Sequence, residues 1–182
     1  MDIGNRRELF IDDHVIDSMT NARAELSVPQ PAGAAITFEN PWEGRFCGAV
    51  TVLHLDGTYH MYYRGWGAEN STEKERQVTC YARSFDAVHW DKPVLEMHEI
   101  DGSKRNNIIL FHPEFSHNFA PFVDTSDRNA GGPFKAVAGT IRSGLHSFES
   151  EDGIHWKETG NPPIVPPGDK VHALDTHNLA FW

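Results

Sequence analysis

Two histidine–asparagine pairs lie 60 residues apart in this sequence, and each opens a similar phrase. His117-Asn118 is followed by Phe-Ala-Pro-Phe, and His177-Asn178 is followed by Leu-Ala-Phe-Trp. Side chains of these types can hydrogen-bond the hydroxyl groups of a ligand or hold a cation through water. They can also satisfy loose backbone groups at the start of a strand. The sequence leaves these alternatives open.

Two carboxylates stand beside strand-like segments of the same kind. Glu43 ends the phrase Asn-Pro-Trp-Glu at 40–43, and Asp175 lies two residues before His177. Two facing carboxylates, one of them kept protonated by its surroundings, can perform general acid–base catalysis. The alternative is structural, with Glu43 in a surface loop and Asp175 as a turn former before a strand.

A second phrase also occurs twice. Ser-Phe-Asp-Ala-Val-His-Trp at 84–90 returns as Ser-Glu-Asp-Gly-Ile-His-Trp at 150–156, a spacing of 66 residues. Two different phrases that recur in the same order at nearly the same period indicate a repeat architecture. Within each phrase we expect the Asp to accept backbone N–H groups in a turn and the Trp to pack between units.

The segments between these phrases have the composition of short strands. Asp56-Gly57 is a strong hairpin signal between two of them, and no segment shows helical periodicity over three turns. Four antiparallel strands in a unit of about 60 residues are typical of a β-propeller blade. The sequence therefore predicts an all-β fold, with strands at 49–55, 58–64, 77–83 and 89–90 in the first unit, and at 118–124, 134–139, 144–148 and 154–157 in the second.

These units give the expected organisation of the chain. Residues 1–37 form an N-terminal strand and loop, 38–100 the first blade, 101–165 the second, and 166–182 the start of a third. A ring of fewer than about four blades cannot close. We therefore expect a partial propeller that belongs to a longer protein.

Composition excludes several classes of function. A net charge of −10 disfavours nucleic acid as a partner, because phosphate binding needs a basic face. The absence of a long apolar run disfavours a membrane span. No signal peptide is recognisable, so localisation stays open between the cytoplasm and secretion with the leader missing. Cys47 and Cys80 form no metal-binding pattern and are expected as buried free thiols rather than as a bridge. No metal site and no cofactor are expected.

The strand–Asp-Gly–strand that ends in Tyr62-Tyr63-Arg64, the Ser-x-Asp-x-x-His-Trp turn and the unit size resemble one known group. They are similar to the five-bladed β-propeller glycoside hydrolases, which include invertases, arabinanases, levansucrases and mannoside phosphorylases. The resemblance covers residues 38–182. It implies action on the glycosidic bonds of oligo- or polysaccharides, with a carbohydrate as the partner.

The resemblance also implies three carboxylates, delivered by the first three blades to a central funnel. Glu43 stands where the first blade would supply an Asp, and the third blade offers Asp175 where a Glu is implied. The second blade offers His117-Asn118, and its nearest carboxylate, Asp124, lies at the far end of a strand, so the set of three carboxylates is not reproduced. A non-catalytic propeller that binds glycans or proteins is therefore the alternative function.

The resemblance also indicates which residues would form the site. Glu43 and Asp175 are the predicted catalytic pair, and they are expected to cluster with both His-Asn pairs at the propeller axis. Aromatic rings near the funnel would stack on sugar rings, and the structural alternative is that they pack between blades. Arg64 would bind a carboxylate or hydroxyl, and the structural alternative is a salt bridge to a neighbouring loop. A central structural cation such as calcium stays an open alternative. The predicted substrate-binding residues are His117, Asn118, His177, Asn178, Arg64, Trp42 and Trp66.

Overall fold

The computed structural model describes residues 4–5, 12–14, 16–45, 47–66, 76–126, 131–160, 162–169, 174–175 and 177–181. The chain divides into two compact units, Met1–Gly33 and Ala34–Trp182. The N-terminal strand predicted within 1–37 falls largely on residues outside the described ranges, and the described residues from 16 to 37 form no regular strand. Within these ranges we find no helix with the length and hydropathy needed to cross a membrane.

The first sheet of the second unit contains four strands in sequence order: β1 (Gly48–Leu55), β2 (Thr58–Gly65), β3 (Val78–Ser84) and β4 (Ile108–Leu110). Each strand pairs antiparallel with the next. Asp56 and Gly57 join β1 to β2 with φ angles of 48° and 79°. Two successive positive φ angles are typical of a type I′ turn, as the Asp-Gly signal predicts.

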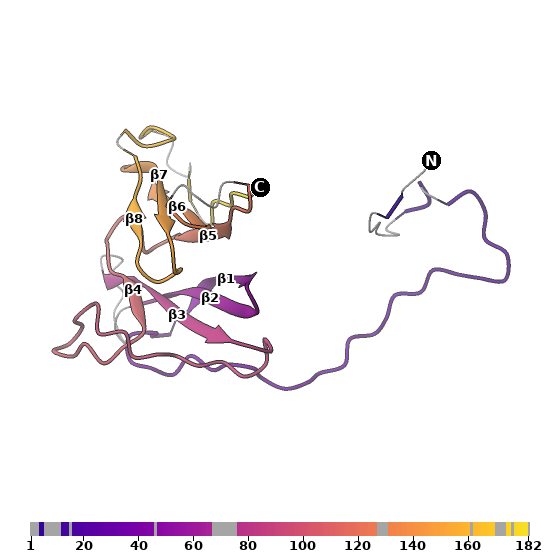
Figure 1. The fold of residues 1–182 in the computed structure, drawn as a ribbon, viewed down its shortest axis with the longest axis horizontal. Helices are drawn as coiled ribbons and strands as arrows, with labels where there is room; N and C mark the ends of the chain where they lie inside the picture. Colours follow the sequence, from indigo (N-terminus) through magenta and orange to yellow (C-terminus); the bar gives the residue numbers. More distant parts are fainter. Residues whose placement is uncertain are drawn as a thin grey trace. The chain divides into compact units, whose positions relative to one another are not determined.

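The second sheet repeats this arrangement with β5 (Ala120–Val123), β6 (Phe134–Thr140), β7 (Gly144–Ser150) and β8 (Lys157–Glu158). Its strands are also antiparallel neighbours in sequence order. Figure 1 shows the two sheets next to each other in the second unit, and the described residues contain no α-helix. The predicted all-β fold with two four-stranded antiparallel sheets is confirmed.

Two strands differ from the prediction. In the second sheet the strand predicted at 154–157 begins only at Lys157 as β8, because residues 151–155 belong to the repeated turn. Residues 89–90 do not form the fourth strand of the first sheet; Asp91 makes only an isolated bridge with Arg83. The fourth strand is β4, which pairs with β3 and lies beyond the boundary predicted at residue 100. The intervening segment folds back on itself through the Leu95 N–H, which donates to Asn106 O at 2.8 Å. The N–H groups of Val88 and His89 bond Asp86 Oδ1 within the turn, so the chain first reaches β3 at Asp91.

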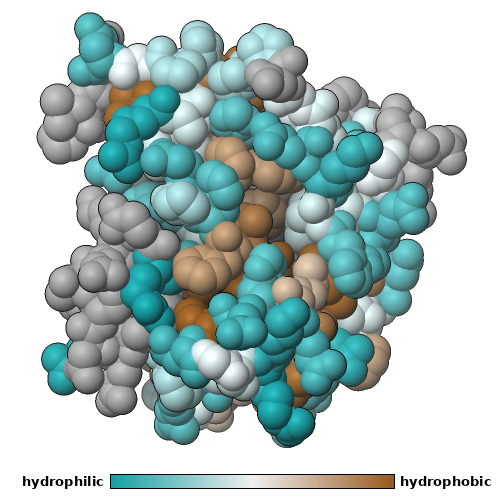
Figure 2. Space-filling view, turned by 90° about the vertical axis from the view of Figure 1, so that its left-hand side faces the viewer, coloured by the Kyte–Doolittle hydropathy of each residue, from teal (hydrophilic) through white to brown (hydrophobic). Residues whose placement is uncertain are grey.

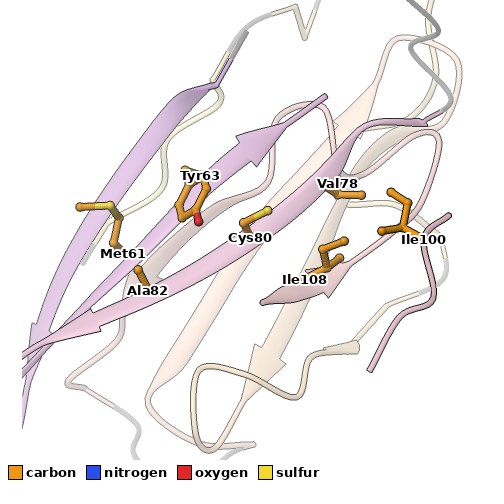
Figure 3. Close-up of a cluster of buried hydrophobic side chains, with 7 residues drawn as sticks. All are labelled: Met61, Tyr63, Val78, Cys80, Ala82, Ile100 and Ile108. Atoms are coloured by element: carbon orange, nitrogen blue, oxygen red, sulfur yellow. The ribbon is translucent and has the colours of Figure 1, made fainter. Parts of the chain in front are cut away.

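The two faces of the first sheet have different roles. On one face Tyr63, Cys80 and Met61 join the buried cluster shown in Figure 3. On the other face Tyr62 contacts the second sheet, where its hydroxyl donates to Gly153 O at 2.9 Å. Trp156 packs against the apolar clusters of both sheets, as predicted, whereas Trp90 packs against the cluster of the first sheet. Figure 2 shows apolar side chains gathered in the middle of one face of the molecule and surrounded by polar ones.

The repeated Ser-Asp-His-Trp turns share one hydrogen-bond pattern. Asp86 Oδ1 accepts the N–H groups of the residues two and three positions later, at 2.9 and 2.8 Å. Asp152 Oδ1 does the same at 2.8 Å in both cases. In each turn Asp Oδ2 lies 2.7 Å from the Nδ1 atom of the following His. The predicted role of the two Asp residues in a turn is confirmed.

This turn predicts an acid-sensitive contribution to stability. Burial raises the pKa of Asp152, but hydrogen bonds from His155, Ile154 and Ser150 outweigh burial and lower that pKa to about 2. The ordinary value is 3.8, so the stabilisation is complete above that pH and is lost as the pH falls towards 2. We expect Asp152→Asn to be less stable than the wild type at pH 6, with a smaller difference at pH 2.5, in urea unfolding.

The matched control for this prediction is Asp169→Asn, because Asp169 is exposed and lies outside the turn. Its stability should follow that of the wild type at both pH values. A difference between Asp152→Asn and the wild type that stays constant from pH 6 to pH 2.5 would contradict the assignment.

Candidate functional site

The pairing of strands brings one end of each sheet together. In the first sheet Arg64, near the end of β2, pairs with Gly48 on β1 and with Thr79 on β3. In the second sheet His117 immediately precedes the segment that leads into β5. The Arg64 guanidinium joins the two ends, because its Nη1 donates to His117 O at 3.0 Å.

Four polar side chains meet at this junction and are called the Arg64 cluster: Arg64, Gln77, His117 and Asp175. His117 is its centre. Its Nδ1 atom lies 2.8 Å from Gln77 Oε1 and 3.3 Å from Arg64 Nη1. Its Nε2 atom lies 3.8 Å from Asp175 Oδ1. The His117 side chain is 22% exposed and that of Asp175 is 56% exposed. The Asp175 carboxylate is therefore open to solvent, while the His117 imidazole is mostly buried next to it.

The cluster carries a partly buried positive charge. Burial lowers the pKa of Arg64, and the nearby Cys47 and Asp175 oppose that shift. Burial, followed by the Glu43 charge, raises the pKa of the Cys47 thiol to about 12, so this thiol is neutral at pH 7. The Asp175 carboxylate is therefore the anionic partner of Arg64 among these two neighbours.

The backbone immediately before Asp175 is held in an unusual conformation. Leu174 has a φ of 58°, in the left-handed region that costs free energy for a residue with a branched side chain. Its carbonyl oxygen accepts hydrogen bonds from Asn118 Nδ2 at 3.1 Å and from Asn178 Nδ2 at 3.2 Å. The two asparagines of the repeated His-Asn pairs thus converge on one carbonyl and fix the position of the next residue, Asp175.

Asn118 is also tied to the second sheet. Its Oδ1 atom accepts the Gly139 N–H at 3.0 Å, and its Nδ2 atom donates to Gly139 O at 2.6 Å. Gly139 has a φ of 147°, and a Cβ atom there would lie 1.9 Å from Gly144 O. A glycine is therefore required at this position, and Asn118 acts on backbone groups in the way the structural alternative describes.

His177, two residues after Asp175, contacts the first sheet. Its Nε2 atom lies 3.4 Å from Thr51 Oγ1 on β1. On the other side, Leu174 and Ala180 pack against a buried cluster of the second sheet that contains Val137 and Leu145. Leu174, His177 and Ala180 therefore contact both sheets next to the Arg64 cluster.

The two tryptophans of the predicted site lie in different surroundings. The Arg64 guanidinium carbon is 5.7 Å from the Trp66 ring centroid, which places Trp66 beside the cluster. Trp42 donates from Nε1 to Asn107 Oδ1 at 2.8 Å. It lines an open cavity of about 560 Å³ together with Trp90 and Lys92.

The Glu43 carboxylate is buried beside the core of the first sheet. Its side chain is 0% exposed and its Oε1 atom is 2.6 Å from Lys92 Nζ. Oε1 also accepts the Tyr63 hydroxyl at 2.6 Å, and Oε2 accepts the Asn40 N–H at 2.8 Å. Tyr63 and Arg64 are consecutive strand residues and point to opposite faces. The Glu43 contacts therefore lie on the face opposite Arg64, and its catalytic assignment stays a prediction.

Of the predicted site residues, the structure brings Arg64, His117, Asn118, Asp175, His177, Asn178 and Trp66 to one end of the two sheets. Sequence reasoning missed Gln77, Thr51 and Leu174. Gln77 could have been suspected from the sequence, because it is a polar residue at the start of the strand predicted at 77–83. Leu174 offered no signal, because its role comes from backbone conformation. In the described part of the chain no three His, Cys, Asp or Glu side chains are grouped so that they could hold a metal ion.

No family model matches the chain. A stretch of 112 residues is 30% identical to an uncharacterized protein of Mycobacterium tuberculosis, and the match covers 60% of this chain and 33% of that protein. The chain thus spans about a third of the length of this relative.

Solved structures that the chain resembles include a glycosyl hydrolase from Bacteroides ovatus, at 20% identity and a TM-score of 0.36. The match covers 64% of this chain and 30% of the hydrolase. An α-L-arabinanase mutant from Cellvibrio cellulosa matches at 13% identity and a TM-score of 0.43, over 74% of this chain and 46% of the arabinanase.

Proposed function

We propose that this chain is part of a carbohydrate-active protein that acts on glycosidic bonds, with Asp175 as a catalytic carboxylate at the Arg64 cluster. The observation that carries the proposal is the way Asp175 is held. Two asparagines fix the left-handed backbone of Leu174, and His117 Nε2 lies 3.8 Å from the Asp175 carboxylate. Strained backbone that is fixed by surrounding contacts is characteristic of functional sites.

The chemistry follows from the position of Asp175. Hydrolysis of a glycosidic bond passes through a transition state with positive charge on the sugar ring, and one carboxylate stabilises that charge, attacks the anomeric carbon or activates water. An exposed carboxylate such as Asp175 suits these roles. The proton for the leaving oxygen then comes from a second carboxylic acid.

The other residues of the site have binding and positioning roles in this proposal. Arg64 and His117 offer hydrogen-bond donors to sugar hydroxyls, while the Trp66 ring beside Arg64 offers an apolar surface for a pyranose. Asn118 and Asn178 position Asp175 through the Leu174 carbonyl. Glu43 positions the segment before β1 through its contacts with Lys92 and Tyr63.

A non-catalytic glycan-binding protein is the second candidate. One observation favours it: the carboxylate of Glu43, the other predicted catalytic residue, is fully buried and paired with Lys92. Hydrolysis requires two carboxyl groups on either side of the bond. In this alternative the Arg64 cluster would bind a sugar without cleaving it.

The proposal is tested on the full-length protein with a panel of plant and microbial oligosaccharides and aryl glycosides. Release of reducing sugar or of the aryl group is measured together with binding by calorimetry. We expect cleavage of at least one substrate class. If the protein binds a sugar without cleaving it, the glycan-binding alternative holds and the enzyme proposal is wrong. If the protein neither binds nor cleaves any of these sugars, both candidate functions are wrong.

A further inference from the structure

Three polar side-chain atoms near the Arg64 end of the first sheet are buried and, within the residues that the structure describes, have no hydrogen-bond partner. They are Arg64 Nε, Gln77 Nε2 and Thr79 Oγ1. A buried donor without a partner loses its hydration without any compensating bond, and native proteins rarely leave several such groups together. A small bound species that the three atoms share would remove this cost.

These atoms lie on one face of the first sheet. Arg64 and Thr79 are directly paired between β2 and β3. Gln77 lies two residues before Thr79, and side chains two positions apart on a strand point to the same face. Gln77 Oε1 and Arg64 Nη1 are both within 3.3 Å of His117 Nδ1, which confirms that the amide and the guanidinium are neighbours.

The donor set indicates the charge of the missing species. Arg64 Nε and Gln77 Nε2 carry only N–H donors, and the Thr79 hydroxyl also has a proton to donate. A cation would need oxygen ligands such as carboxylates. Arg64 adds a positive charge that is half-buried, and burial already lowers its pKa. Both the hydrogen bonds and the charge therefore favour an anion, in place of the structural cation that the sequence left open.

We infer that Arg64, Gln77 and Thr79 form a binding site for one small monatomic anion of the halide class, buried between the two sheets. The bound halide accepts the three free donors and neutralises part of the Arg64 charge. Through Arg64 and Gln77, which both contact His117, it fixes the imidazole that faces Asp175. The inference depends on buried donors and not on any sugar chemistry, so it stands or falls separately from the proposed function.

The first test is the melting temperature of the full-length protein at constant ionic strength, in sodium chloride, sodium bromide or sodium gluconate. We expect a saturable rise of roughly 3–6 °C in the two halide salts when the halide exceeds its Kd about tenfold. Gln77→Glu places a carboxylate in the donor set and should abolish this dependence. Gln30→Glu changes an exposed glutamine and should keep it.

The second test is a crystal of the full-length protein in sodium bromide. An anomalous bromide peak within hydrogen-bond distance of Arg64 Nε and Gln77 Nε2 is expected. Three results would each overturn the inference: an ordered water with no anomalous signal at that point, equal melting temperatures in halide and gluconate, or a halide response that persists in Gln77→Glu.

Discussion

Asp175→Asn in the full-length protein should lower turnover on a cleaved glycoside by roughly 10²–10⁴-fold, the range typical of a lost acid–base group. The substitution keeps the shape of the side chain and removes its charge. The transition state loses its stabilising carboxylate, whereas substrate binding depends mainly on other groups, so kcat should fall much more than KM rises. Steady-state kinetics on the same substrate measure both values.

The fold should survive this substitution. The Asp175 side chain is 56% exposed, and its contact with His117 is long, at 3.8 Å. The melting temperature should therefore change little, which separates a catalytic effect from unfolding. Asp169→Asn is the matched control, since it removes an exposed carboxylate upstream of the same segment and should keep full activity.

A variant Asp175→Asn with near-normal kcat would leave Asp175 as a turn former and would favour the glycan-binding alternative. Equal loss of activity in Asp169→Asn would show that the effect is not specific to the Arg64 cluster. Neither outcome bears on the halide site, because that site is tested by the salt dependence of the melting temperature and by anomalous diffraction.

Lys92→Met should destabilise the protein by about 3–5 kcal/mol, because it leaves the fully buried Glu43 carboxylate without its cationic partner. The Lys92 side chain is 19% exposed, and its Nζ atom also donates to Thr37 O at 2.6 Å. The substitution therefore loosens two segments at once. Urea unfolding of the full-length protein measures the change in the free energy of unfolding.

The control for this prediction is Lys157→Met, in which an exposed lysine of β8 is replaced by the same residue. Its stability should stay within about 0.5 kcal/mol of the wild type. The double variant Lys92→Met/Glu43→Gln should recover part of the loss, since the uncompensated charge is removed. A Lys92→Met protein as stable as Lys157→Met would show that the Glu43–Lys92 pair contributes nothing.

The strands and turns were predictable because they depend on local chemistry. Asp56-Gly57 has the positive φ angles that a type I′ turn requires, and the hydrogen bonds of Asp86 and Asp152 reach residues only two or three positions away. Such contacts are encoded in short stretches of sequence. The fourth strand of the first sheet was not predictable in this way, because β4 reaches β3 only after the long segment that follows the turn.

The repeated His-Asn pairs lie at the same end of the two sheets, but their sequence did not show which groups each residue would contact. The sequence by itself determined the all-β fold, the repeated turn and the residue types at the site, since period and turn chemistry are local properties. Tertiary structure alone decided that both asparagines hold the Leu174 carbonyl and that His117 faces Asp175. It also decided that Glu43 is buried against Lys92, on the face opposite Arg64. The contacts of Asn118, His117 and Glu43 join residues about 50 or more positions apart, so only the tertiary fold brings these groups together. Asn178 lies only four positions from Leu174, but its carbonyl partner is shared with Asn118 through the fold.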